Sequence, residues 1–392
     1  MTPRDFAAYL YSAYDRHRRT DLSPSNCRHN IIVPEIERLA RLSDGLLKAE
    51  EAGCSLEGRS ILHVSFGHGA TPVLLWSQMH GDEPTATLAV IDMFEYLVAS
   101  AADEWVRELL RAVTVHIIPL LNPDGAERFR RFTGAEIDMN RDARALITPE
   151  AKILREAQRT YRPEFGFNLH DQGLSSVGMT SKVAALSLLA PALDEARTAP
   201  LGRVKAMRVG ALIVDALSPF IDGSMATYDD SYEPRAFGDG MQSWGTSTLL
   251  IESGHWPHDP EKQFIRKLNF VGLMTSLASI GNGSYQHVDL DAYRSLVPNG
   301  KRAYDIIVRG VTLRHPGDWT EQVDLGLLTA PQNGQTSDFG GPESLYAIKE
   351  IGDLRDFGAL SEINAKTRTI RSQDVAVEKT IRMGELRALL QL

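Results

Sequence analysis

Cysteines and long apolar runs are both scarce in this sequence. Its 392 residues include only Cys27 and Cys54, too few for the disulfide framework of a small secreted domain. No run of about 18 apolar residues could cross a membrane. The N-terminal stretch MTPRDFAAYLYSAYDRHRR also lacks the apolar region of a signal peptide. These absences predict a cytoplasmic protein with reduced thiols and no membrane partner.

Dense positive charge is lacking as well. The formal net charge is -9, and the basic cluster Arg16-His17-Arg18-Arg19 is short, so nucleic acid is not an expected partner. With 43% hydrophobic and 24% charged residues, the chain has globular proportions. It is long enough for one large domain and a smaller one.

The spacing of apolar residues predicts the domain organisation. Residues 1–53 have apolar positions at helical spacing and are expected to form a helical N-terminal segment. Short apolar runs and helical segments then alternate as far as residue 280, which predicts a mixed, twisted α/β sheet with helices on both faces. The expected buried strands are 61–66, 72–79, 113–121, 165–169 and 246–251.

The last part of the chain has a different pattern. Residues 281–300 are rich in Gly, Asn and Ser, and are interpreted as a linker between a catalytic domain, 1–280, and a small β-rich accessory domain, 301–392. The strands expected in the accessory domain are 304–313, 323–328, 346–351 and 375–381. We expect this domain to be structural.

Polar side chains follow four of the predicted strands where each strand ends. His80 and Glu83 follow the second strand, Asn122-Pro-Asp-Gly125 the third, His170 the fourth and Glu252 the fifth. Ligands of open α/β sheets bind at the carboxyl ends of the strands. We therefore expect these groups to lie in one crevice.

Two histidines and a carboxylate from this set fit a metal site. His80 and Glu83 are three residues apart in a strand-to-helix turn, where an imidazole nitrogen and a carboxylate oxygen can reach one ion. His170 would be the third protein ligand of a catalytic zinc, whose fourth position is kept for water or substrate. Glu252 is the expected general base. Taken singly, each has a structural alternative: a surface histidine with a helix-start glutamate, a core histidine, and a capping or ion-paired carboxylate.

The whole ordered set of motifs resembles the zinc carboxypeptidase family typified by carboxypeptidase A, in a bacterial-type form with an extra C-terminal domain. The matching elements are Ser55-Leu-Glu-Gly-Arg59, His80-x-x-Glu83, Asn122-Pro-Asp-Gly125, Asp138-Met-Asn140-Arg141, His170 and Glu252. They cover residues 50–260, and their joint occurrence is more specific than any single motif. The resemblance implies one zinc ion held by His80, Glu83 and His170, with Glu252 as base toward a zinc-activated water and then as acid.

The same resemblance implies how substrate is held. Asn140 and Arg141 would bind the free carboxylate of the substrate, a task that suits the planar guanidinium. Asp138 would accept a hydrogen bond from a ligand histidine and fix its tautomer. The structural alternatives are a turn residue for Asn140 and a surface salt bridge for Arg141.

Two assignments remain open between neighbours. The family uses an arginine to stabilise the oxyanion of the reaction intermediate, and Arg131 matches best, with Arg128 and Arg130 as competitors. A tyrosine that closes over substrate lies somewhat over twenty residues before the base in digestive members. Here Tyr228 and Tyr232 bracket that distance.

Three functions are weighed against these residues. The favoured one is a metallocarboxypeptidase or amidohydrolase that cleaves an amide bond next to a free carboxylate. The alternative is an N-acyl amino acid deacylase similar to succinylglutamate desuccinylase or aspartoacylase, but the N-P-D-G and S-x-E-G-R elements favour the peptidase. A catalytically silent binding module is disfavoured because all the expected ligands and the base are present. The expected substrate is therefore a peptide or N-acyl amino acid with a free carboxylate.

Overall fold

The computed structural model describes residues 2–330, 344–366 and 368–391, which divide into two compact units. The first unit contains the described residues up to 172, together with 186–253 and 263–297. The second contains 173–185, 254–262 and the described residues from 298 onward. The segment 281–300, interpreted from the sequence as a linker, begins inside a helix that ends at Asn282 and spans the last residues of the first unit.

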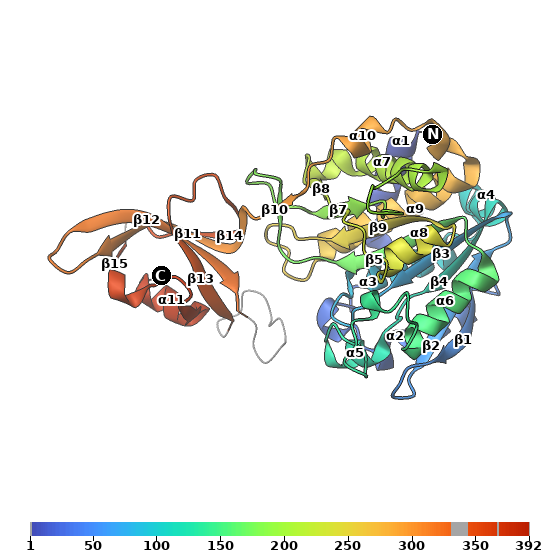
Figure 1. Ribbon diagram of the computed structural model, residues 1–392, viewed down its shortest axis with the longest axis horizontal. Coiled ribbons are helices and arrows are strands. Elements are labelled where there is room, and N and C mark those ends of the chain that lie inside the picture. The colour runs from blue at the N-terminus through green and yellow to red at the C-terminus, as the bar shows by residue number, and fades with distance from the viewer. Residues whose placement is uncertain (1, 331–343, 367, 392) are drawn as a thin grey trace. The chain divides into compact units, whose positions relative to one another are not determined.

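An eight-stranded sheet forms the centre of the first unit (Figure 1). Its order is β1-β2-β4-β3-β5-β9-β7-β8, and the central strands β4, β3, β5 and β9 run parallel. β1, β2 and β7 introduce antiparallel pairs. The predicted mixed α/β sheet is thereby confirmed. The strands are Lys48–Cys54 (β1), Ser60–Gly67 (β2), Thr71–Ser77 (β3), Val113–Ile118 (β4), Phe165–Asp171 (β5), Leu186–Leu189 (β7), Met225–Thr227 (β8) and Ser247–Ser253 (β9).

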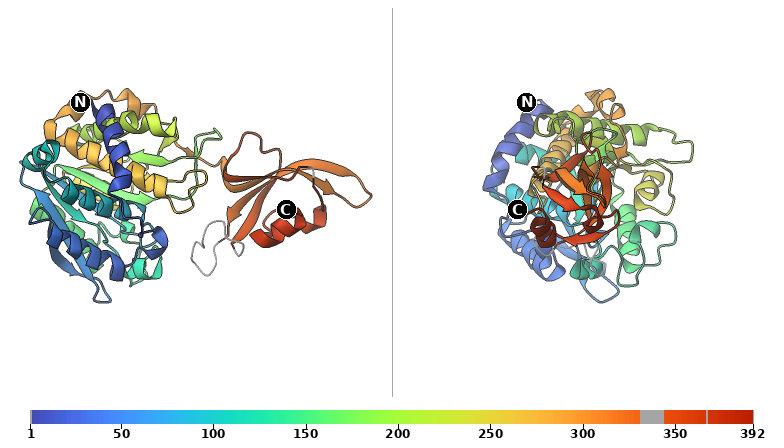
Figure 2. Two further views of the ribbon diagram at one scale, coloured as in Figure 1. Left: turned by 180° about the vertical axis from the view of Figure 1, so that it is seen from behind. Right: turned by 90° about the vertical axis from the view of Figure 1, so that its left-hand side faces the viewer.

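Helices cover both faces of this sheet, as Figures 1 and 2 show. On one face, α6 and α8 pack against Leu74 and Trp76 of β3. On the other face, α3, α7 and α9 pack against one another. The helices of this unit are Pro3–Ala13 (α1), His29–Leu42 (α2), Thr85–Ala99 (α3), Glu104–Ala112 (α4), Pro123–Arg128 (α5), Pro149–Tyr161 (α6), Leu201–Ile221 (α7), Phe237–Ser243 (α8), Gln263–Asn282 (α9) and Asp291–Arg294 (α10).

α3 is the most apolar stretch of a bent pair of helices, α3 and α4. Within the described ranges, no single helix is long and apolar enough to cross a membrane, and only the bent pair α3 and α4 passes that test together. α3 is buried over most of its length, as expected for a helix that packs under a sheet.

Residues 48–53, which the helical pattern was expected to include, form part of β1 instead. This strand lies at the edge of the sheet, and among the described strands it pairs with β2 alone. Most of its residues are exposed, so it lacks the apolar run by which buried strands are recognised.

The second unit is β-rich, as predicted. Its six-stranded sheet has the order β14-β11-β12-β13-β16, with β15 beside β11, and its core includes Val308, Leu325 and Ile348. The strand expected at 375–381 is present only at its end, because residues 375–379 are not in a strand and include a turn at residues 377 and 378. The elements are Ser176–Val177 (β6), Asn299–Gly300 (β10), Ala303–Arg314 (β11), Thr320–Thr329 (β12), Leu345–Gly352 (β13), Gly358–Asn364 (β14), Thr369–Arg371 (β15), Thr380–Arg382 (β16) and Met383–Leu389 (α11).

Candidate metal centre

The chain turns sharply between the end of β3 and His80. Gln78 has a left-handed backbone conformation (φ 52°), and Nδ2 of Asn122 donates to the carbonyl oxygen of the residue before His80 at 3.1 Å. A Cβ on Gly81 would lie 2.0 Å from the backbone carbon of Gly125, so a side chain cannot fit there. The Asn-Pro-Asp-Gly motif therefore supports the turn that carries His80.

Three buried side chains converge at the ends of β3 and β5. Nδ1 of His80 lies 2.7 Å from one carboxylate oxygen of Glu83, and Nδ1 of His170 lies 2.7 Å from the other. One potential ligand atom from each residue lies within 4.8 Å of the others. The structure thus brings together the three residues that the sequence singled out as zinc ligands.

Opposing electrostatic effects act within this trio. Burial lowers the pKa of His80, but the charge of Glu83 and hydrogen bonds with Asp138 and Glu83 outweigh it and raise the pKa to about 9. Burial also lowers the pKa of His170, which stays below its ordinary value. Burial raises the pKa of Glu83, yet the two histidines together hold it below its usual range. The trio therefore favours a positive charge at its centre.

The donor set fits a zinc ion. Two imidazole nitrogens and one carboxylate are a ligand set that catalytic zinc sites use. Nε2 of His80 donates to Oδ1 of Asp138 at 3.1 Å, which leaves Nδ1 of the neutral ring with the lone pair that a metal needs. Asp138 thus occupies the position expected of a residue that fixes a ligand tautomer.

Arg131 lies against the same group of side chains. Its Nε and one terminal nitrogen donate to Oδ2 of Asp138 at 3.2 and 3.0 Å. The other terminal nitrogen lies 3.2 Å from Nδ1 of His80 and 3.4 Å from a carboxylate oxygen of Glu83. The guanidinium is 39% exposed, so it is accessible at the edge of the metal centre.

The two competing arginines have other partners. Arg128 pairs with Glu57 at 2.6 Å, and Arg130 makes two hydrogen bonds to Glu136, at 2.9 and 2.6 Å. The geometry therefore favours Arg131 over Arg128 and Arg130 as the candidate for stabilising the oxyanion.

Glu252 lies beside His170 in the sheet. The two residues are directly opposite each other on the parallel strands β9 and β5, so their side chains leave the same face. Glu252 is buried, with 6% of its surface exposed. This register places the Glu252 carboxylate next to His170, one of the three candidate zinc ligands His80, Glu83 and His170, which we call the metal trio.

The two candidate tyrosines lie in different places. Burial and then the charges of Glu252 and Glu83 raise the pKa of Tyr228 to about 12, so its phenol lies within electrostatic range of these two carboxylates. Tyr232 instead lines a surface depression with Arg155 and Trp244. Tyr228 is therefore the better candidate for contact with substrate.

Asn140 and Arg141 end a short 3-10 helix, Met139–Arg141, and Asn140 contacts the start of α8. Oδ1 of Asn140 accepts a hydrogen bond from the backbone N–H of Phe237 at 2.9 Å. Nε of Arg141 lies 3.7 Å from a carboxylate oxygen of Glu233, and the Arg141 side chain is 43% exposed. Hydrogen bonds from Arg235 lower the pKa of Glu233 to about 2, so a charged carboxylate lies near the Arg141 guanidinium.

The motifs that flank the metal centre are joined by one buried carboxylate. Oδ1 of Asp124 accepts hydrogen bonds from Ser55 at 2.6 Å and from Arg59 at 2.7 Å. Oδ2 accepts the backbone N–H of Glu57 at 3.1 Å. This contact explains why the Ser-x-Glu-Gly-Arg and Asn-Pro-Asp-Gly motifs occur together.

One supporting residue was missed by the sequence reasoning. The backbone N–H of Asp171 donates to Glu83 at 3.2 Å, and its side chain accepts a hydrogen bond from Thr85 at 2.5 Å. The only signal in the sequence was its position directly after His170.

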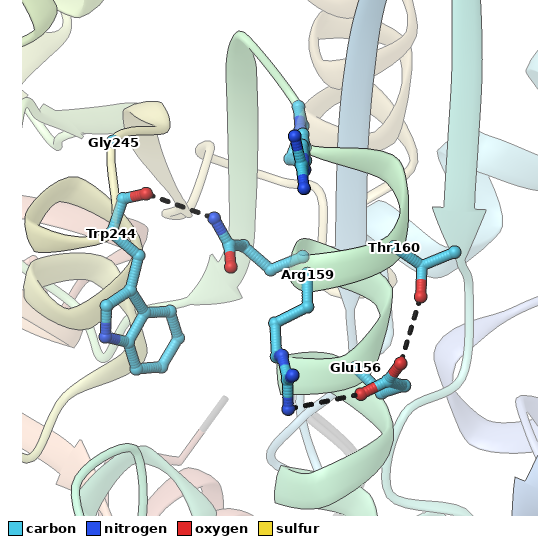
Figure 3. A pocket seen from close by; sticks show the side chains of 8 residues that line it. Glu156, Arg159, Thr160, Trp244 and Gly245 are labelled. Atoms are coloured by element: carbon cyan, nitrogen blue, oxygen red, sulfur yellow. Dashed lines mark hydrogen bonds and ion pairs between the residues drawn. The ribbon is translucent and has the colours of Figure 1, made fainter.

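A surface depression beside Trp244 lies apart from these residues (Figure 3). It is lined by the C-terminal part of α6 and by Trp244 and Gly245, and Arg159 pairs with Glu156 along it. None of the metal trio lines it, so we assign it no catalytic role.

Together, the sheet and the buried trio resemble the zinc carboxypeptidases, and comparisons with known proteins agree. Residues 32–171 match the family model described as zinc carboxypeptidase. Over 146 residues the chain is 25% identical to Carboxypeptidase 2 of Trichophyton rubrum, a match covering 35% of this chain and 27% of that protein. The chain thus spans only about a quarter of that relative's length. The predicted resemblance to the zinc carboxypeptidases is confirmed.

Solved structures show the same fold. A metallo-carboxypeptidase from Burkholderia cenocepacia aligns with a TM-score of 0.52 at 17% identity, covering 64% of this chain and 68% of that one. Carboxypeptidase A from Helicoverpa armigera aligns with a TM-score of 0.53 at 16% identity, covering 72% and 80%.

Proposed function

We propose that this chain is a zinc-dependent hydrolase of the metallocarboxypeptidase type, which cleaves the amide bond next to a free carboxylate. The observation that carries this proposal is the buried His80, Glu83 and His170 trio, with Glu252 in register beside His170. Nδ1 of each histidine faces the Glu83 carboxylate, as a shared ligand site requires.

A zinc ion held by the trio would act as a Lewis acid that polarises the scissile carbonyl and makes a water more acidic. Glu252 takes the proton of the attacking water and then delivers it to the leaving amine, so the proton moves from oxygen to nitrogen through one carboxylate. Arg131 donates to the oxygen on which negative charge develops. Asp138 supports this step because it orients both Arg131 and His80.

Asn140 and Arg141 orient the substrate by its terminal carboxylate. The side-chain Oδ1 of Asn140 already accepts a hydrogen bond from the backbone N–H of Phe237, so the side-chain amide nitrogen is the group that faces substrate. The partly exposed Arg141 guanidinium can accept a carboxylate in the bidentate geometry that arginine favours. Glu233 lies close enough to hold Arg141 in place before substrate arrives.

A substrate panel tests this function. The zinc-loaded protein is incubated with blocked dipeptides, murein peptides and N-acyl amino acids, and released amino acids are quantified. We expect hydrolysis of peptides with a free C-terminal carboxylate. Cleavage of N-acyl amino acids alone would instead support the deacylase. If the purified protein binds no zinc even after supplementation, the silent binding module is supported.

Substitution of Arg141 tests the carboxylate site directly. Arg141→Ala is expected to lower kcat/KM roughly 100-fold for peptides with a free carboxylate, because a charged hydrogen-bonded pair is lost. Peptides with an amidated C-terminus should be affected much less. Arg144→Ala is the matched control, since this exposed arginine lines the depression formed with Tyr232, Arg155 and Trp244. Equal losses on both substrate types would contradict the proposed role.

A further inference from the structure

Asn168 is a buried polar residue for which the proposed mechanism has no use. It lies on β5 two residues before His170 and has no exposed surface. Neither Nδ2 nor Oδ1 has a hydrogen-bond partner among the described residues. Burying an amide without partners is unfavourable, so a bound group is expected to satisfy it.

The register of the sheet places Asn168 on the same face as His170, two residues earlier along β5. Alternate side chains of a strand share one face, so Asn168 and His170 point to the same side. Asn168 lies opposite Trp76 on β3 and Leu250 on β9. On β5 and β9, Asn168 and Leu250 come two residues before the paired His170 and Glu252. Nε1 of Trp76 is also buried without a partner in the described ranges.

The first turn of α8 connects Asn168 with the carboxylate site. A Cβ on Gly238 would lie 3.7 Å from Nδ2 of Asn168 and 3.0 Å from Cγ of Pro191. The preceding residue, Phe237, donates its backbone N–H to Asn140. Asn168 therefore lies near the same helical turn that Asn140 contacts. If Asn140 holds the substrate carboxylate as proposed, the adjacent substrate side chain can reach this turn.

We propose that Asn168 is a specificity-determining residue, which recognises an uncharged amide side chain on the substrate residue that carries the free carboxylate. This inference rests on the proposed function. An asparagine offers both a carbonyl acceptor and N–H donors, the arrangement complementary to glutamine or asparagine. The substrate amide donates to Oδ1 and accepts from Nδ2.

Size-matched substrates test this recognition. Benzyloxycarbonyl-glycyl-glutamine and benzyloxycarbonyl-glycyl-leucine are assayed with the zinc-loaded wild-type protein, Asn168→Ala and the milder Asn168→Ser. We expect the wild-type kcat/KM to favour glutamine by at least about tenfold, because unpaired buried polar groups penalise leucine. Both variants should reduce this preference about tenfold or more, mainly through the glutamine substrate. Thr275→Val is the matched control, because its buried hydroxyl also lacks a partner among the described residues and lies on α9.

Binding of the product amino acids provides a readout that does not need turnover. Calorimetry with L-glutamine and L-leucine should show the same preference in the folded wild-type protein, and its loss in both Asn168 variants. Peptide cleavage without preference for glutamine overturns this inference and leaves the proposed function standing. Preferential glutamine binding without any cleavage overturns the proposed function instead. A change in melting temperature with an unchanged preference shows that Asn168 is only structural, and likewise overturns the inference.

Discussion

At the scale of single residues, the candidate site depends on one carboxylate shared by two imidazoles. Glu83 presents one oxygen to each histidine at 2.7 Å, and the backbone of Asp171 holds one of these oxygens in place. Asp138 in turn fixes His80 and Arg131. Metal binding and proton transfer are therefore assigned to different side chains, and single substitutions should separate them.

Glu252→Gln is the sharpest substitution at this scale. We expect it to retain zinc, because Glu252 is not one of the three ligands, and to lower kcat by about 10²–10⁴-fold through loss of the proton acceptor. Zinc content by atomic absorption and steady-state kinetics measure the two effects. The exposed Glu108→Gln on α4 is the control. A Glu252 variant with a near wild-type rate would show that the base is another group.

At the scale of elements, a buried ion pair joins the helices behind the sheet. Asp92 on α3 and Arg266 on α9 are each 1% exposed and are linked at 2.6 Å, and Tyr14, next to α1, donates to Asp92 at 2.7 Å. Arg266 also donates to the carbonyl oxygen of Leu22 at 2.8 Å. The N-terminal segment is thus fixed to the sheet-covering helices through polar contacts rather than apolar packing alone.

Asp92→Asn should therefore be strongly destabilising. It leaves a buried guanidinium without its charge partner, which typically costs about 3–5 kcal/mol of unfolding free energy. Asp15→Asn removes a pair with Lys267 in which the carboxylate is 62% exposed, and it is expected to cost less than about 1 kcal/mol. Urea unfolding followed by circular dichroism compares the two variants. Similar losses in both would mean that burial of the Asp92 pair is unimportant.

A second interaction between elements should make stability depend on pH. His63 on β2 lies 3.0 Å from His116 on β4, and both rings stack with Tyr161. Burial and then the charge of His63 lower the pKa of His116 to about 4. Between an ordinary histidine pKa of about 6.5 and this value, the unfolded chain binds a proton that the folded chain does not.

The free energy of unfolding should therefore be fully retained above about pH 6.5 and fall as the pH decreases toward 4. His116→Gln should flatten this part of the profile, whereas the exposed His287→Gln should not. Melting temperatures across this pH range give the measurement. An unchanged slope in His116→Gln would assign the dependence to other groups.

At the scale of the whole molecule, the metal trio belongs entirely to the first of the two compact units. A ligand that binds only the folded state stabilises it by mass action. Zinc should therefore stabilise this unit without directly stabilising the β-rich one. The two units provide an internal comparison within one chain.

Zinc removal tests this linkage. Added Zn²⁺ at about 100 times its Kd should stabilise the first unit by about 2.7 kcal/mol, and chelation should reverse the effect. Calorimetry should show that the part of the unfolding transition that belongs to the first unit moves to a higher temperature when zinc is added. Glu83→Gln should reduce the shift, whereas Glu108→Gln should retain it. An equal zinc effect in the Glu83 variant would place the metal elsewhere.

The sequence by itself determined the sheet type and the residues at its strand ends. Buried parallel strands carry continuous apolar runs, so β3, β5 and β9 could be recognised, and His80, His170 and Glu252 follow from where those runs stop. It could not reveal β1, because an exposed edge strand has a polar composition. It also favoured Arg131 without excluding Arg128 or Arg130, and it left Tyr228 and Tyr232 open.

Only the tertiary structure distinguishes those neighbours by their contacts. Arg131 contacts Asp138 and His80, while Arg128 and Arg130 pair with other carboxylates, and no local pattern encodes that difference. Asn168 became a candidate for the same reason, since burial without partners depends on residues distant in the chain. Strand periodicity is a local property of the sequence, whereas the partner of a side chain is set by how distant segments pack.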